Sequence, residues 1–109
     1  MSAGVVTSLR EVMALSRAMR RAATDGVTDS LGEQMARRGE LVEEAAAGLA
    51  AMEEGHALPA GEREALAAML AELAQENALL IQALKERQRE IIRCIAEAEG
   101  HRKLSAYAR

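Results

Sequence analysis

Apolar residues recur every three or four positions through three stretches of this chain, which is the spacing of one face of an α-helix. The first stretch predicts a helix over about 8–24, where Ser8 and Glu11 have the spacing of a capping box. Its stripe is Val5, Leu9, Val12 or Met13, Ser16, Met19 and Ala23. Asp25 and Gly26 predict a turn after it, because glycine accepts the left-handed backbone that often ends a helix.

A second helix is predicted over about 28–54, with an apolar stripe that Arg38 interrupts. The stripe comprises Leu31, Met35, Val42, Ala45, Leu49 and Met52. Gly32 and Gly39 lie inside this helix, where each glycine costs about 1 kcal/mol relative to alanine. Two interpretations stay open: another backbone approaches closely at these glycines, or they face solvent and loosen the helix.

The third stretch follows a loop that Gly55, Pro59 and Gly61 mark, and it predicts a helix over about 60–99. Its heptad seam is Leu66, Leu70, Leu73, Asn77, Leu80, Leu84, Arg87, Ile91, Cys94 and Ala98. From Glu62 to Glu99 this helix would be about 57 Å long against about 40 Å for the second, so part of its surface should be uncovered. Gly100 predicts its end, which leaves 100–109 as a tail or a short C-terminal helix.

Asn77 and Arg87 are polar residues within the apolar seam of the third helix. A buried polar seam residue fixes register at a cost in stability, whereas a solvated one marks a surface that faces a partner. Because the second helix is predicted to end earlier, the sequence favours the partner-facing interpretation slightly. Ile81 lies off the seam and is the better candidate for a contact surface.

These elements predict a single all-α domain over 1–109, an antiparallel bundle of three helices with a long third helix. The length of 109 residues agrees with one domain. The composition is rich in Ala, Glu, Leu, Arg and Met, which are strong helix formers, and it lacks Trp and Phe. The core should therefore be aliphatic and thin.

The residues that carry chemistry are scattered in a way that predicts neither an enzyme nor a cofactor. His56 and His101 lie at opposite ends of the third helix without spaced ligands beside them, which argues against a metal site. Cys94 occupies the seam, where a small buried hydrophobe is favoured over a nucleophile. The net charge of −3 argues against nucleic acid, and the lack of a long apolar run argues against membrane insertion. A cytoplasmic protein is expected.

The stretch from Glu76 to Arg109 carries a resemblance to a known family. The residues E-N-A-L-L-I-Q-A-L-K-E-R-Q-R-E-I, followed by R-K-L-S-A-Y-A-R, are similar to a pattern in the FliT-type chaperones of bacterial flagellar export. The short first helix, the glycine-marked turn and the long third helix extend this likeness over nearly the whole chain. Ala106, Tyr107 and Arg109 are its least generic part, whereas the chain is poorer in aromatic residues than the family.

The resemblance implies a cytoplasmic chaperone that binds the C-terminal helical part of the filament-cap protein and delivers it to the export gate, with export ATPase components as further candidate partners. The expected partner-binding residues are Leu70, Leu73, Ala74, Asn77, Ile81 and Leu84. Leu70, Leu73 and Leu84 are more often intramolecular core in so small a bundle. In the family the C-terminal segment can fold back over this surface, which makes Leu104 and Tyr107 candidates for an autoinhibitory tail.

Two alternatives remain beside the cap-protein chaperone. A chaperone of the FlgN kind would serve the hook-filament junction proteins through a similar bundle. A coiled-coil adaptor would instead self-associate through the seam from Leu66 to Ala98, so that a homodimer is a further candidate assembly.

Overall fold

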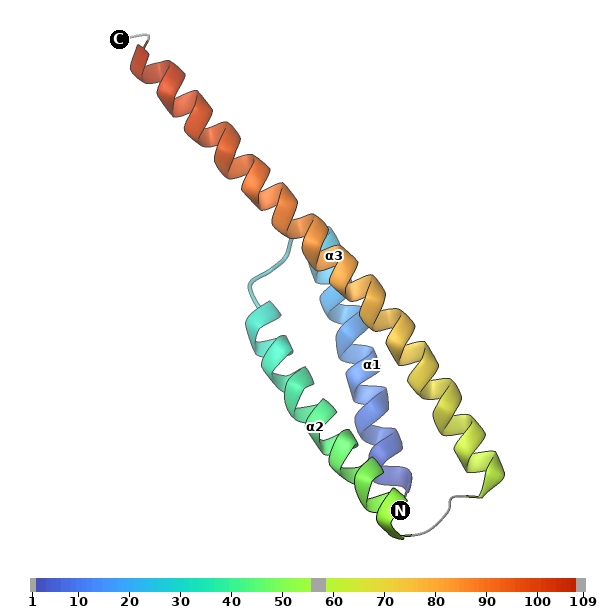
Figure 1. Ribbon diagram of the computed structural model, residues 1–109. Helices are drawn as coiled ribbons and strands as arrows, with labels where there is room; N and C mark the ends of the chain where they lie inside the picture. Colours follow the sequence, from blue (N-terminus) through green and yellow to red (C-terminus); the bar gives the residue numbers. More distant parts are fainter. Residues whose placement is uncertain (1, 56–58, 108–109) are drawn as a thin grey trace.

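The computed structural model describes residues 2–55 and 59–107, which form three helices and no strand. These are α1 (Ser2–Asp25), α2 (Leu31–Gly55) and α3 (Ala60–Tyr107). The chain runs along α1, returns along α2 and runs along α3 in the direction of α1 (Figure 1). The predicted all-helical class with a long third helix is confirmed.

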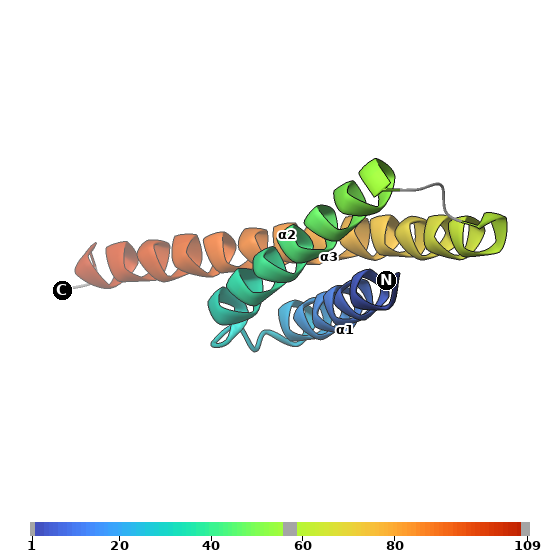
Figure 2. The ribbon, with the colours of Figure 1, turned by 90° about the horizontal axis from the view of Figure 1, so that it is seen from below.

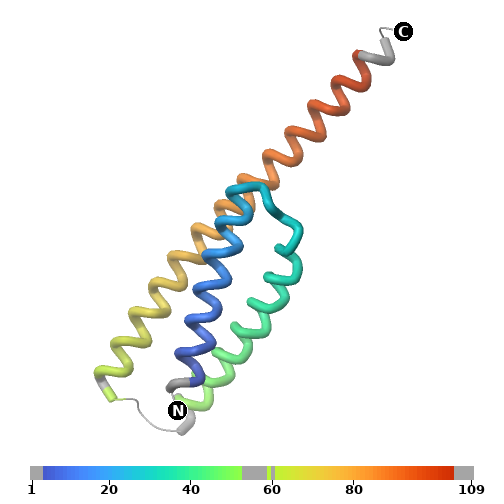
Figure 3. The backbone as a smooth tube through the Cα atoms, turned by 180° about the vertical axis from the view of Figure 1, so that it is seen from behind, coloured from blue at the N-terminus to red at the C-terminus, as the bar shows by residue number. Residues whose placement is uncertain are grey.

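Helix α1 lies between the other two helices and packs against both (Figure 3). Among the described residues, no Cα atom of α2 lies within 8 Å of one in α3. The predicted stripe of α1 is buried throughout: Val5, Leu9, Val12, Met13, Ser16, Met19 and Ala23. This single stripe therefore forms the central layer of the core.

The predicted start of the first helix at Ser8 is wrong, because α1 begins at Ser2. No proline lies between these positions, and burial of Val5 in a core cluster with Leu9 and Ala45 stabilises the added turns despite Gly4. The capping-box spacing of Ser8 and Glu11 occurs inside the helix. Local cap chemistry was overridden by packing.

The turn after α1 forms as the sequence predicts. Gly26 has a φ of 79°, and the N–H groups of Gly26 and Val27 donate to the carbonyls of Ala23 and Ala22. This is the Schellman pattern, which satisfies carbonyls at the end of a helix. The second helix begins at Leu31, later than predicted, and the Ser30 carbonyl accepts the first bond of its opening turn.

The predicted stripe of α2 is partly wrong. Leu41 and Ala45 are buried, whereas Met35 and Val42 of the predicted stripe are exposed. Because α2 packs on α1 and is inclined to α3 (Figure 2), its buried face centres on the line of contact with α1. An apolar strip along α2 is thereby left at the surface.

The surroundings of Gly32 and Gly39 distinguish close approach of another backbone from exposure to solvent. A Cβ atom added at Gly32 or Gly39 would meet nothing within 4 Å, so both glycines face open space. Close approach occurs instead at Gly48, where an added Cβ would lie 2.5 Å from Cγ2 of Val5. Helices α1 and α2 therefore approach each other closely at this level.

Helix α3 contains 48 residues and gives the molecule its long dimension of 75 Å. It runs through Gly100 without a break, so the predicted helix end there, and with it a separate short C-terminal helix, is wrong. One glycine costs only about 1 kcal/mol in a helix, and the residues that follow it are mostly good helix formers without proline.

The first half of α3 packs on α1 and the second half projects beyond the bundle (Figure 1). Every described side chain from Gln88 to Leu104 is exposed. Cys94 lies in this segment and is exposed, so its predicted burial is wrong. The seam continues past Arg87, but no helix within the described residues covers it.

Replacing Gly48 by alanine tests the close contact between α1 and α2. Val5 is β-branched and cannot turn aside easily, so Gly48→Ala should lower the free energy of unfolding by about 1–2 kcal/mol, despite the better helix propensity of alanine. Chemical denaturation followed by far-ultraviolet circular dichroism measures this.

Gly39→Ala is the matched control in the same helix. It should raise the free energy of unfolding by about 0.5–1 kcal/mol, because nothing stands where its Cβ would lie. Equal stabilisation by both substitutions would contradict the close approach at Gly48.

Candidate functional site

A polar layer crosses the middle of the bundle and joins all three helices. The Arg38 guanidinium of α2 donates from Nε to Oγ of Ser16 on α1, at 2.8 Å. It also donates from Nη2 to Oδ1 of Asn77 on α3, at 2.7 Å. Since α2 and α3 make no close backbone approach, this side-chain bridge sets the level at which they face each other.

A second polar contact lies beside this layer and ties α1 to α3. Arg20 donates from Nε and Nη2 to the two carboxylate oxygens of Glu76, at 2.6 and 3.3 Å. Glu76 is 6% exposed, so the guanidinium satisfies a carboxylate that would otherwise be buried alone. The hydrogen bond to Glu76 raises the pKa of Arg20. The pair fixes the register of α3 against α1.

Arg87 caps the end of α1. Its Nε donates to the Ala23 carbonyl at 2.8 Å and its Nη2 donates to the Thr24 carbonyl at 3.0 Å. A cation at a helix C-terminus also matches the negative end of the helix dipole. Arg87 and Asn77 are half-buried and hydrogen-bonded within the bundle, which agrees with a role in fixing register.

An uncovered apolar surface surrounds the bridge between α2 and α3. Residues three, four or seven positions from Arg38 and Asn77 share the helix faces that this bridge joins. On those faces lie Met35 and Val42 of α2, and Leu70, Ala74 and Ile81 of α3, which we call the α2–α3 face. Its four large apolar side chains are between 39 and 48% exposed. The missing contact between α2 and α3 leaves them at the surface.

The six predicted partner-binding residues separate into two groups. Leu70, Ala74 and Ile81 are exposed on the α2–α3 face. Leu73 packs against the core cluster of Val5, Leu9 and Ala45, while Asn77 and Leu84 are half-buried. Met35 and Val42 were assigned to the core by their spacing. Both residues lie one turn from Arg38 in the sequence. The charge of Arg38 indicated that this edge of α2 is not fully buried.

The projecting part of α3, residues 88–104, is a second uncovered surface that we call the α3 extension. Ile91, Ile92 and Ile95 are exposed on it. Leu104 is exposed on the same segment, which projects away from the bundle (Figure 1). The side chain of Tyr107 lies outside the described residues. The helix here continues in line with α3 and leaves the α2–α3 face open.

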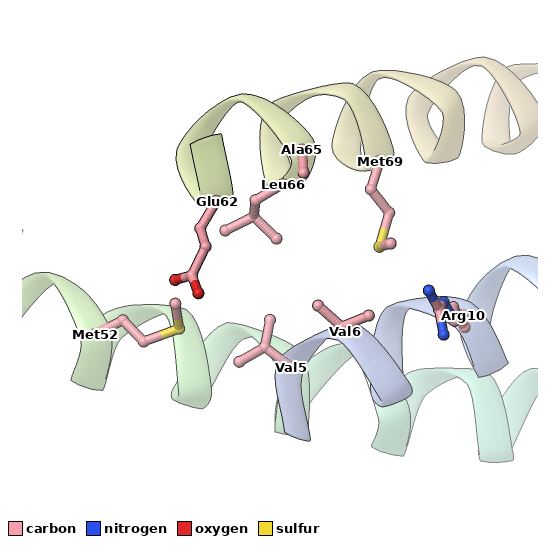
Figure 4. Close-up of a pocket in the computed structure, with 8 residues that line it drawn as sticks. All are labelled: Val5, Val6, Arg10, Met52, Glu62, Ala65, Leu66 and Met69. Carbon is pink, nitrogen blue, oxygen red and sulfur yellow. The ribbon is translucent and has the colours of Figure 1, made fainter. Parts of the chain in front are cut away.

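A cavity of about 200 Å³ lies at the end of the bundle where α1 and α3 begin. Apolar side chains of all three helices line it, with Arg10 and Glu62 as its charged residues (Figure 4). A small-molecule site normally adds several convergent polar groups to an apolar lining. Two charges at the margin do not provide that, so this cavity marks incomplete packing at the end of a thin core.

The described residues contain no group of three or more His, Cys, Asp or Glu side chains that could hold a metal ion. His101 is exposed, and His56 lies outside the described residues. Within the part of the chain that the structure describes, no helix has the length and apolar character needed to cross a membrane. What the molecule does offer is uncovered apolar helix surface, which suits association with another helix.

The geometry defines a three-helix protein with an extended third helix and an uncovered apolar face. Comparison of the chain with protein-family models, curated proteins and solved structures finds no match. The resemblance to flagellar export chaperones therefore stays a prediction from the sequence.

The polar layer is tested by removing the guanidinium of Arg38 while keeping its apolar stem. Arg38→Met should lower the free energy of unfolding by about 1–3 kcal/mol, because the buried hydroxyl of Ser16 and the amide of Asn77 lose their partner. Thermal and chemical denaturation measure the change.

The neighbouring Arg37 provides a matched control, since its ion pairs with Glu11 and Glu40 are exposed. Arg37→Met should change stability by less than about 0.5 kcal/mol. If both substitutions had the same small effect, Arg38 would not be holding the three helices in register.

Proposed function

We propose that this chain is a cytoplasmic export chaperone of the FliT type, which binds the C-terminal helical region of a flagellar filament-cap protein and holds it for delivery to the export gate. The observation that carries the proposal is the α2–α3 face, where apolar side chains of two helices surround a fixed polar bridge without being covered. The sequence resemblance over Glu76 to Arg109 supplies the choice of client.

The α2–α3 face has the properties that recognition of an amphipathic helix requires. Leu70, Ala74 and Ile81 recur along α3 at helical spacing, and Met35 and Val42 provide a second apolar edge on α2. A client helix laid along this face would bury apolar area on both of its flanks, as a fourth helix does in a bundle. Met35 can adjust its shape to an imperfectly matched client because its side chain is unbranched.

The polar bridge gives this surface a fixed reference point. Asn77 is held by Arg38, and Arg38 is held by Ser16, so the polar group at the centre of the face has a defined position. A polar client residue placed at that level would keep a hydrogen-bond partner, whereas an apolar one would leave the bridge covered by hydrocarbon. This favours one client register over others.

The identity of the client is the part of the proposal that rests on resemblance. A FlgN-like chaperone for hook-filament junction proteins would use the same kind of surface, so exchanging the bait distinguishes the two. Contacts with the export gate, and with export ATPase components as further candidates, would follow from the same family likeness.

Binding of the C-terminal helical segment of the cap protein tests the proposal. Ile81→Glu should weaken binding at least about tenfold, because a carboxylate would replace an apolar anchor at the centre of the interface. Isothermal titration with the purified full-length chain and the client segment gives the affinity. Circular dichroism checks that the variant keeps its helical content.

Leu79→Glu is the matched control. Leu79 is also exposed on α3, but it lies two residues from Ile81 and therefore on nearly the opposite side of the helix. The affinity of this variant should match that of the natural chain. Absence of binding to either bait, or equal loss in both variants, would overturn the proposal.

A further inference from the structure

The α3 extension carries an apolar strip that no part of the described structure covers. Ile91, Ile92 and Ile95 are between 46 and 58% exposed. Their spacing of three and four residues places them on one side of the helix. A monomer would leave these three isoleucines in water, which is unfavourable. Burying such side chains against a neighbour lowers the free energy.

The charges beside this strip follow a pattern that distinguishes the two ways of pairing it with a copy of itself. Lys85, Ile92 and Glu99 succeed one another at intervals of seven residues, so they form one row along the edge of the strip. In a parallel pair each residue would face its own copy, which would bring Lys85 against Lys85 and Glu99 against Glu99. In an antiparallel pair the ends of the row exchange places, and Lys85 meets Glu99.

We propose that the α3 extension is an antiparallel homodimerisation segment, in which the occupant of the apolar strip is the same strip of a second copy of this chain. The two-fold axis passes at the level of Ile92. Ile91 of one chain then packs diagonally against the partner's Ile95, about 3 Å off level, and the reverse contact forms by symmetry. Ile92 packs beside the partner's Ile92 at the edge of the interface.

The same register places the charges favourably without further adjustment. Lys85 and Glu99 are equidistant from Ile92, so Lys85 of each chain lies beside the partner's Glu99. Two intermolecular ion pairs therefore flank the isoleucine cluster, one at each end. Charges at such edge positions choose partner and orientation in helical pairs more than they add stability.

The length and direction of the extension agree with this arrangement. An overlap from Leu84 to Gly100 would be about 25 Å long on each chain. Because the extension projects from one end of the bundle, antiparallel pairing places the two bundles at opposite ends of the dimer. Parallel pairing would place both bundles at the same end, where they would compete for space.

This inference does not depend on the proposed function. The dimer uses the α3 extension, whereas client binding uses the α2–α3 face, and the substitutions that test them differ. Failure to dimerise would leave client binding intact, and failure to bind a client would leave the dimer intact.

Sedimentation equilibrium of the full chain, from about 1 to about 100 µM, tests the proposal over the range expected for a small helical interface. The natural chain should pass from its monomer mass of 11.7 kDa to twice that mass. Ile92→Glu should weaken the dimer at least about a hundredfold, because two carboxylates would meet at its centre. A natural chain that stays monomeric, or an Ile92→Glu variant that still dimerises, would overturn the proposal.

Leu104→Glu is the control for these measurements. Leu104 is an exposed apolar residue of the same extension, and its position nine residues from Ile95 places it on the opposite side of the helix. This variant should dimerise like the natural chain. Equal weakening by Leu104→Glu and Ile92→Glu would assign the association to general apolar exposure and overturn the specific interface.

Charge exchange tests the orientation. Lys85→Glu and Glu99→Lys should each weaken the dimer about tenfold, since each turns both ion pairs into repulsions. The double variant with both substitutions should regain the natural affinity, because the pairs re-form with reversed signs. A parallel pair would gain nothing from the double substitution, so absence of rescue would overturn the antiparallel arrangement. If adding the client segment dissociates the dimer, the apolar strip around Ile92 binds the client. That result would also overturn the proposed dimer.

Discussion

The packing of α1 between α2 and α3 is the constraint on which the rest of the structure depends. The buried stripe of α1 supplies most of the core, and the other two helices meet through side chains rather than through close backbone approach. A helix of 24 residues cannot cover one of 48. Uncovered apolar surface on α3 is therefore a direct consequence of the helix lengths.

The polar layer makes this thin core specific. With no Phe or Trp, the core offers little of the shape-determined packing that aromatic side chains provide. Arg38, Ser16 and Asn77 form a bridge that only one alignment of the three helices satisfies, and Arg20 with Glu76 adds a second. Arg87 then fixes the level at which α1 ends on α3. These contacts determine which side chains remain outside.

The sequence predicted the parts of the structure that depend on one helix at a time. The stripe of α1 and the turn at Gly26 followed from spacing and from backbone preference. The burial of Leu41 in place of Val42 did not, because it depends on the angle at which α2 meets α1. A one-residue difference in spacing is too small for the pattern alone to resolve.

The continuation of α3 and the exposure of Cys94 could not be predicted for a related reason. A heptad seam shows that a helix is able to pack, but the presence of a neighbour depends on the lengths of other helices. Gly100 weakens a helix without ending it, so the end is set by the balance of neighbouring propensities. In the candidate site, Ile81 was identified because it lies off the heptad seam of α3. Met35 was missed because it lies on the predicted apolar stripe of α2.

We propose the α2–α3 face as the docking surface for a client helix. Amide hydrogen exchange of the full chain, with and without the C-terminal helical segment of the cap protein, tests it most directly. Binding should slow exchange in residues 70–84 of α3 and 35–42 of α2, where a docked helix would suppress local opening. Unchanged exchange in both segments with a bound client would contradict it.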